Sequence, residues 1–160
     1  MRVVAFSDSH RNHRNVSRLF EQTCLTTDVY IFLGDGEDDL DGIRALYPEK
    51  TILQVAGNCD IGSKEARLSM TELAGKKIVF CHGHMQGVRY GISGLCDLAR
   101  QTGADVVLYG HTHERRCDYI DGVYYINPGS IGLPRDGLAP SYAAIDILPS
   151  GILCTHAELE

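Results

Sequence analysis

The chain has 160 residues, of which 44% are hydrophobic and 22% are charged, so it can bury a sizeable core. Its formal net charge of -6 disfavours nonspecific attraction to nucleic acid or to an anionic membrane, and no stable complex with either is expected. No apolar stretch is long enough to cross a bilayer, and the opening MRVVAFSDSH lacks the pattern of a signal peptide. We therefore expect one domain, residues 1–160, in the cytoplasm.

Six cysteines are spread along the chain, and none of them belongs to a C-x-x-C pair. A zinc ribbon or a thioredoxin-type motif is therefore not expected, and in the cytoplasm the thiols stay reduced. Four cysteines lie in apolar contexts and are interpreted as small core residues, namely Cys24, Cys81, Cys96 and Cys154. Cys59 lies in a polar motif and is considered with the candidate site.

The first part of the chain alternates strands with helices. Three buried strands are predicted, at residues 3–7, 29–33 and 51–55. Apolar residues at helical spacing from Val16 to Phe20 indicate a helix that Asn12 or Asn15 could cap. A second, shorter helix is expected to end before Pro48. This alternation predicts a parallel sheet with right-handed crossovers.

The rest of the chain is rich in hairpin signals. Strands are predicted at residues 68–73, 77–81, 106–109, 116–120, 123–126, 142–148 and 152–156, and a helix at residues 94–101. Asp121-Gly122 is a strong two-residue turn signal. The tyrosines Tyr90, Tyr124 and Tyr125 are expected in the core or on a sheet face. A parallel half followed by a hairpin-rich half predicts two sheets packed face to face, with helices outside.

Metal-ligand-type residues follow five of the apolar runs. These residues are Asp8, His10, Asp35, Asn58, His82, His111 and His113. Asp8 and His10 form D-x-H, and on an extended stretch such a pair points to the same side. Because sites in open α/β sheets lie at the carboxyl ends of strands, all of these residues are expected to assemble one site. Seven ligands exceed the needs of one tetrahedral ion and suit two ions with open positions for water or substrate.

The chain also contains six short motifs that resemble, in order, those of the calcineurin-like metallophosphoesterase superfamily: DSH, GD, GNCD, CHGH, GHTH and NPGS. It more closely resembles the small, single-domain bacterial and archaeal branch of phosphodiesterases. The resemblance implies a four-layer α/β/β/α sandwich of two mixed sheets flanked by helices. It also implies two metal ions, one bound by Asp8, His10 and His113 and the other by Asn58, His82 and His111, with Asp35 bridging them.

The same resemblance implies hydrolysis of phosphate diesters by a hydroxide that bridges the two ions. The candidate catalytic residues are Asp35, Asn58, Cys59 and His82. The sequence departs from the commonest family pattern at Cys59, where many members have a histidine that protonates the leaving group. A neutral thiol with a reference pKa near ~8.5 suits that role poorly. We therefore expect a preference for diesters, or for leaving groups that need little protonation.

The expected ligands are oxygen and nitrogen atoms without a thiolate. This donor set favours two divalent ions, for which manganese is the preferred interpretation, while iron, nickel, zinc, cobalt and magnesium stay open. The expected partner is a small phosphodiester, with nucleotide-like diesters included. The sequence leaves a homo-oligomer open.

Three other functions are considered. A catalytically weak, metal-binding protein-interaction scaffold of the same fold is one, because some eukaryotic trafficking subunits resemble this family. Retention of every ligand type argues against it. A phosphomonoesterase is the second. A single-zinc hydrolase of the H-x-H-x-D-H type is disfavoured because GHTHERR lacks the following Asp-His.

Two further residues stand near the motifs. His84, the second histidine of CHGH, is a candidate for supporting a ligand or contacting substrate, against the alternative of a plain loop histidine. Arg135, in the loop after NPGS, could meet a phosphate, although a surface arginine is the simpler interpretation.

Overall fold

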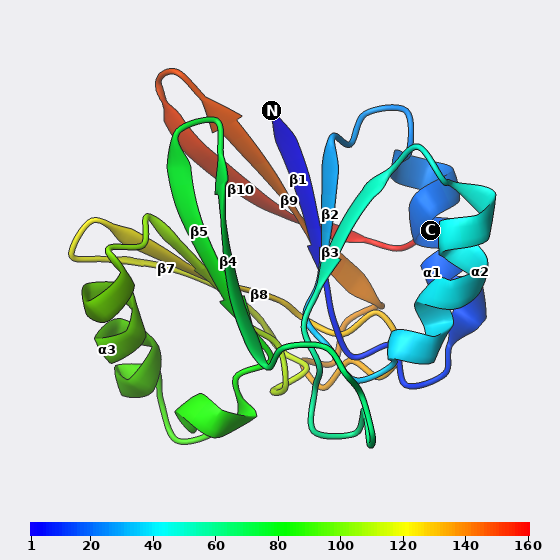
Figure 1. The fold of residues 1–160 in the computed structure, drawn as a ribbon, viewed down its shortest axis with the longest axis horizontal. Coiled ribbons are helices and arrows are strands. Elements are labelled where there is room, and N and C mark those ends of the chain that lie inside the picture. The colour runs from blue at the N-terminus through cyan, green and yellow to red at the C-terminus, as the bar shows by residue number, and fades with distance from the viewer.

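The computed structural model describes residues 1–160 as two five-stranded mixed sheets packed face to face, with helices on the outer faces (Figure 1). The first sheet has the order β10-β9-β1-β2-β3, with β1 Arg2–Phe6, β2 Val29–Phe32, β3 Thr51–Gln54, β9 Ser141–Leu148 and β10 Gly151–Glu158. The second has the order β4-β5-β6-β8-β7, with β4 Leu68–Leu73, β5 Lys76–Cys81, β6 Val106–Leu108, β7 Arg115–Ile120 and β8 Val123–Pro128. The helices are α1 His13–Thr23, η1 Glu37–Leu40, α2 Asp41–Leu46, η2 His84–Gln86 and α3 Ser93–Thr102.

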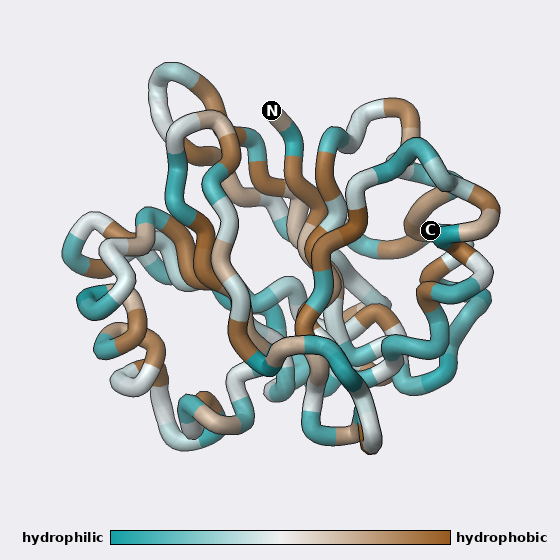
Figure 2. Tube along the Cα trace, in the orientation of Figure 1, coloured by the Kyte–Doolittle hydropathy of each residue, from teal (hydrophilic) through white to brown (hydrophobic).

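Successive side chains of each central strand point to opposite faces of its sheet, so each strand contributes to two layers of the core. In β1, Val3 and Ala5 face the second sheet, whereas Val4 and Phe6 face α1. In the second sheet, β5 and β6 pack against the first sheet on one face and against α3 on the other. Figure 2 shows the strands as the hydrophobic centre of the molecule and the loops at the lower edge as mostly hydrophilic. The predicted four-layer sandwich is therefore confirmed.

The sheet topology explains why one edge of the molecule collects so many loops. Strands β1, β2 and β3 are parallel, as predicted, and β9 closes onto β1 in antiparallel register. In the second sheet β5, β6 and β8 are parallel, while β4 and β7 are added by hairpins. The carboxyl ends of these six strands, three from each sheet, consequently open onto a shared edge, the lower edge in Figure 1.

Two sequence-based expectations about side chains differ from the structure. Tyr90 is 97% exposed, because it follows the short η2 helix in a loop rather than lying on a strand, so its predicted core position is wrong. Of the four cysteines expected in the core, only Cys81 is fully buried, and the other three are partly buried. All six cysteines are free thiols. None of the helices combines the length and the hydropathy that a membrane crossing needs.

Gly34 lets the loops after β2 and β3 approach each other. It has φ +96°, and a Cβ at this position would come within 2.4 Å of the Gly57 backbone nitrogen. Any side chain would therefore push the two loops apart, and a left-handed conformation adds strain for every residue with a Cβ. The close backbone contact fixes where Asp35 and Asn58 stand relative to each other.

We predict that Gly34→Ala lowers the free energy of unfolding by at least ~2 kcal/mol more than Gly87→Ala does, because the added methyl group overpacks against backbone. Gly87 is a matched control, since it has φ +66° but no atom within 4 Å of an added Cβ. Urea denaturation of both variants measures the difference. Equal losses in the two variants would contradict the proposed close approach.

Candidate metal centre

All seven predicted ligands lie on the loops at the shared edge of the two sheets. The first sheet supplies four of them, after β1, β2 and β3, and the second sheet supplies three, after β5 and β6. Six of the seven, all except Asn58, have side-chain atoms within a few ångströms of another member, as the distances below show. The two sheets therefore build the site jointly.

Asp8, His10 and His113 form the first group of the cluster. Asp8 Oδ1 lies 3.1 Å from His113 Nε2 and 3.8 Å from His10 Nε2. The two imidazole Nε2 atoms are 3.3 Å apart. Three donor atoms from two sheets thus face one small volume, as metal ligands do.

Asp35, His82 and His111 form the second group, which adjoins the first. Asp35 Oδ2 is 3.4 Å from His82 Nε2 and 3.9 Å from His10 Nε2, so this carboxylate faces both groups. His111 Nδ1 is 3.3 Å from His82 Nε2, and its backbone N–H donates to Asp8 Oδ2 at 3.1 Å. The position of Asp35 between the groups is compatible with a bridging ligand.

The backbone that presents these residues is unusual. Five of them have positive φ angles outside glycine: Asp8 57°, His10 46°, Asp35 63°, His111 70° and His113 62°. The expectation that D-x-H lies on an extended stretch is therefore wrong, because Asp8 and His10 occupy tight turns anchored by Gly34 and Asp35 carbonyls. Each such residue costs of order 1–3 kcal/mol, and such strain concentrates at functional sites.

Hydrogen bonds on the far side of two imidazole rings set their orientation. His82 Nδ1 lies 2.7 Å from the Leu33 carbonyl oxygen, and His113 Nδ1 lies 2.7 Å from the Leu133 carbonyl oxygen. A carbonyl can only accept, so in both rings Nδ1 carries the proton. In the neutral ring, Nε2 then keeps its lone pair toward the cluster. This arrangement is the one that metal-bound histidines adopt.

The NPGS motif holds the two halves of the site together. Ser130 Oγ donates to the Asp8 carbonyl oxygen at 2.8 Å, and Asn127 Nδ2 donates to the Gly110 carbonyl oxygen at 2.9 Å. Both residues are fully buried, and His156 lies 2.7 Å from the Asn127 carbonyl oxygen. His156 is partly buried in this network.

Burial and charge favour ionised carboxylates here. Burial opposes the ionisation of Asp8, but the adjacent His113 and the charge of His82 outweigh it and keep the pKa of Asp8 below its usual value. For Asp35, burial is outweighed by His82 and by the Cys59 backbone N–H, so its pKa lies well below the usual range. Burial lowers the pKa of His82, but Asp35 and Asp8 raise it further, giving a net increase.

The donor set and its surroundings fit a bound cation. Asp8 Oδ1 is completely buried and receives no well-aligned hydrogen bond. A buried charged oxygen in this state needs a compensating cation or proton, because leaving it unpaired costs several kcal/mol. Carboxylate oxygens and imidazole nitrogens around it are suitable ligands for first-row divalent metals.

Asn58 and Cys59 lie at the exposed side of the cluster. The Asn58 amide donates to Cys59 Sγ at 3.3 Å, and the Cys59 backbone N–H donates to Asp35 Oδ1 at 2.7 Å. The thiol stands near His10 and Asp35. Burial, followed by the hydrogen bond and charge of Asp35, raises the pKa of the Cys59 thiol to about 11, so it stays protonated at neutral pH.

Asp60 organises the loops beneath the cluster, and sequence reasoning missed it. Its carboxylate accepts backbone hydrogen bonds from Asp35, Gly36, Glu37 and Gly57, at 2.7 to 3.1 Å. The signal was available in GNCD, where an aspartate follows glycine-rich loops whose N–H groups need an acceptor. Asp60 therefore connects the turn that presents Asp35 to the turn that presents Asn58.

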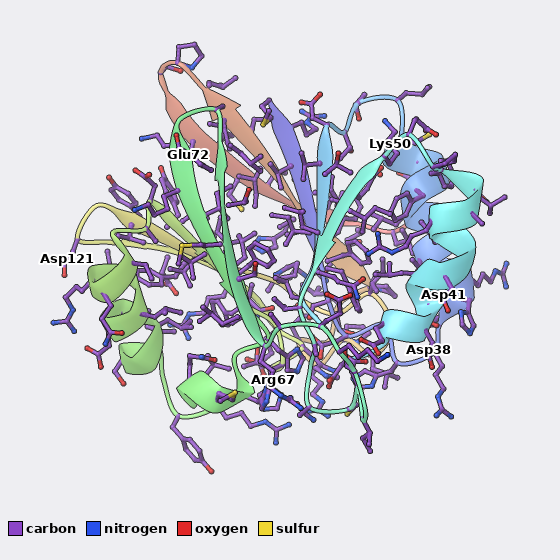
Figure 3. All side chains as sticks on the ribbon, in the orientation of Figure 1. Asp38, Asp41, Lys50, Arg67, Glu72 and Asp121 are labelled. Atoms are coloured by element: carbon purple, nitrogen blue, oxygen red, sulfur yellow. The ribbon has the colours of Figure 1, made fainter.

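Arg67 and His84 stand at the rim, and Arg67 was also missed from the sequence. Arg67 Nη1 donates to the Gly57 carbonyl oxygen at 3.2 Å and lies 3.3 Å from His84 Nε2. Figure 3 places the labelled Arg67 at the lower edge, near the ends of β4 and β5. Burial, with the charges of His82 and Arg67, lowers the pKa of His84, so this histidine is neutral beside the cluster.

A cleft of about 380 Å³ opens next to the cluster, beside His10, Asp35 and Cys59. Its outer wall is formed by the acidic segment Glu37–Asp39, and Ile61 adds an exposed apolar residue. The volume suits a small organic ligand rather than a polymer.

Two sheets with carboxylates and histidines at a shared edge define a metallophosphoesterase type of domain. The family model described as the calcineurin-like phosphoesterase superfamily domain matches residues 1–149. The chain belongs to this superfamily.

Three curated relatives illustrate the range of the family. The chain is 30% identical to a probable metallophosphoesterase of Bacillus subtilis, YsnB, over 92% of this chain and 85% of that protein. It is 32% identical to vacuolar protein sorting-associated protein 29 of Schizosaccharomyces pombe, over 91% and 78%. Phosphodiesterase YfcE of Escherichia coli is 27% identical, over 59% of this chain and 52% of that protein.

Solved structures agree on the fold. A conserved protein of Streptococcus pneumoniae, described as a predicted phosphoesterase, superimposes with a TM-score of 0.79 at 25% identity. The match covers 98% of this chain and 97% of that one.

We predict that Asp60→Asn lowers the free energy of unfolding by roughly 2–4 kcal/mol. Both carboxylate oxygens of Asp60 accept hydrogen bonds from backbone N–H groups, and the asparagine side chain would place an NH₂ group against some of these N–H groups. The matched control is Asp41→Asn, an exposed aspartate at the start of α2, which should change stability by less than ~1 kcal/mol. Thermal and urea unfolding of both variants provide the measurement. Equal stability of the two variants would contradict an organising role for Asp60.

Proposed function

We propose that this chain is a metal-dependent phosphodiesterase that binds two divalent cations and hydrolyses small phosphate diesters. The observation that carries the proposal is the convergence of two ionised carboxylates and four histidines, with the buried Asp8 Oδ1 lacking an aligned donor. Two-metal sites of this composition are typical of phosphate-ester hydrolysis. The names of the B. subtilis and E. coli relatives support the same class of reaction.

The ligands divide naturally between two cations. Asp8, His10 and His113 would bind one cation, and His82 and His111 would bind the other together with the amide oxygen of Asn58. Asp35 would contact both, because its Oδ2 faces His10 and His82. The short distances within each group support this division.

When bound, the cations supply acidity to a water molecule and neutralise the phosphate oxygens as charge develops. The residues of the chain orient and insulate this chemistry. His82 and His113 are held by the Leu33 and Leu133 carbonyl oxygens, so their Nε2 atoms keep one direction. Arg67 offers a permanent positive charge beside His84, where a phosphate oxygen or leaving group can be stabilised.

The metal preference follows from the ligand atoms. Five or more imidazole and carboxylate donors without a thiolate suit manganese, which we propose as the native metal. Iron, nickel, cobalt, zinc and magnesium are the alternatives. Cys59 does not change this choice, because a thiol with a pKa of about 11 is a poor ligand at neutral pH.

Diesters are favoured over monoesters because the cluster offers no good proton donor for the leaving group at Cys59. The raised pKa makes the thiol an even weaker acid than an ordinary cysteine. A substrate whose leaving group needs little protonation is the best match. The 380 Å³ cleft fits a small diester, with nucleotide-like diesters included.

A second candidate function is a metal-binding protein-interaction scaffold. The likeness to the S. pombe sorting protein favours it, since that relative is 32% identical over most of this chain. A scaffold has no physical need for a strained, six-residue ligand cluster, which is why we prefer the enzyme. A cytoplasmic location and a single functional domain belong to the proposal as well.

We predict that metal-stripped protein hydrolyses an aryl phosphodiester only after manganese or another divalent metal is added back. Asp35→Ala should lower kcat/KM by at least about a hundredfold, because both cations lose a ligand. Asp41→Ala changes an exposed aspartate at the start of α2 and is the control, which should retain activity. Bound metal without hydrolysis in the unmodified chain would favour the scaffold.

We also predict that Cys59→His raises turnover of the matching aryl phosphomonoester by about tenfold or more, since it adds a proton donor to the leaving group. Cys59→Ala is the control, and it should leave monoester turnover low. Steady-state rates at equal metal occupancy give the comparison. If Cys59→His binds metal and cleaves diesters normally without a gain on monoesters, the proposed role of this position is wrong.

A further inference from the structure

A second hollow lies beside the metal centre and differs sharply from the cleft next to Asp35. It has a volume of about 410 Å³ and adjoins Thr112, the residue between His111 and His113. Its walls come from the loop after η2, the start of β7 and the loop that follows NPGS. Its polar lining includes Arg89, Glu114, Arg115, Arg116 and Arg135.

The four arginines of this hollow are not equivalent. Arg115 is committed to the fold, because its guanidinium binds Asp136 at 2.9 Å, Glu158 at 3.1 Å and the Ala139 carbonyl oxygen at 2.9 Å. Arg116 is exposed and has one partner, the half-buried Asp118, at 2.6 Å. The guanidinium groups of Arg89 and Arg135 form neither a hydrogen bond nor an ion pair within the chain. Two permanent positive charges are thus free to bind a ligand.

Both free arginines are tied to the metal centre by their positions. The Arg135 backbone N–H donates to the carbonyl oxygen of His113 at 3.0 Å. The backbone of Arg135 is therefore bonded directly to the backbone of a predicted metal ligand. Arg89 lines the same hollow as Thr112, which lies between the predicted ligands His111 and His113. The hollow is therefore a continuation of the site rather than a remote surface feature.

The charges on the two sides of the centre are opposite. The cleft beside Asp35 is lined by Glu37, Asp38 and Asp39 and by only one arginine, Arg11, so it disfavours a second phosphate group beyond the diester itself. The hollow beside Thr112 has a single acidic lining residue, Glu114, against its arginines. In a chain with a net charge of -6, a local excess of arginine is a specific feature rather than a general one. A diester lying across the centre would be oriented by this difference.

We propose that Arg89 and Arg135, with Arg116 at the margin, bind a second phosphate group of the substrate, so that the preferred diesters carry an additional terminal phosphate. This inference rests on the proposed function, because it assigns one end of the same substrate. Guanidinium groups bind phosphate through charge-assisted hydrogen bonds, often in pairs. The second phosphate would fix which ester bond faces the cations.

The test compares a dinucleotide that carries a 5′-phosphate with the same dinucleotide lacking it. For the unmodified chain, kcat/KM should be about tenfold higher for the phosphorylated substrate, the effect of one charge-assisted contact. Arg89→Gln/Arg135→Gln should reduce this ratio to near one. Arg14→Gln, an exposed arginine of α1 outside both hollows, should leave the ratio unchanged.

A binding measurement separates the inference from the proposed function. In an NMR titration of the zinc-loaded protein, we expect added sulfate to shift the Nε–H resonances of Arg89 and Arg135. Both shifts should saturate with the same apparent Kd, while the Arg14 resonance stays unchanged. Discrimination in hydrolysis together with saturable shifts would support the proposal. Hydrolysis of both dinucleotides at equal rates would overturn it and leave the phosphodiesterase proposal standing. If neither is hydrolysed, the proposed function fails, and absence of saturable shifts would overturn the anion site as well.

Discussion

The carboxylates of Asp8 and Asp35 are held almost completely out of water at the edge where the two sheets meet. An isolated carboxylate in such a place would cost many kcal/mol or become protonated. Here the pKa values of both groups are kept low by imidazoles from the second sheet and, for Asp35, by a backbone N–H. The carboxylates of the first sheet are stabilised in their charged form by histidines of the second sheet. This attraction favours the packing of the two sheets that brings these residues together at the site.

The cost of building this edge is visible in the backbone. Five cluster residues occupy the left-handed region, and Gly34 is squeezed against Gly57. These conformations persist because buried polar residues over-determine them: Asp60 binds four N–H groups beneath Asp35, and Ser130 holds the turn at Asp8. Preorganisation of this kind keeps ligand atoms in position before any cation or substrate arrives.

Much of the fold could be predicted from the sequence, and so could the proximity of six of the seven candidate ligands. Buried strands such as Val29–Phe32 are short apolar runs, and Asp121-Gly122 marks a hairpin, so periodicity and turn chemistry were sufficient. The candidate ligands could be recognised because polar residues at strand ends stand out against apolar runs. The contacts of Asp60 and Arg67 and the partly buried position of His156 depend on segments that are brought together by the fold, which local patterns do not encode. The left-handed turns at Asp8 and His10 were missed for the same reason.

The two sides of the cluster differ in charge: the side next to Asp35 is acidic, and the side next to Thr112 is basic. All functional consequences nevertheless depend on the two groups of ligands binding two cations. Anomalous diffraction from crystals of the manganese-loaded protein tests this point most directly. The account predicts two peaks about 3.5–4 Å apart, one among Asp8, His10 and His113 and the other beside His82 and His111, with Asp35 between them. A single peak, or manganese bound elsewhere on the chain, would contradict it.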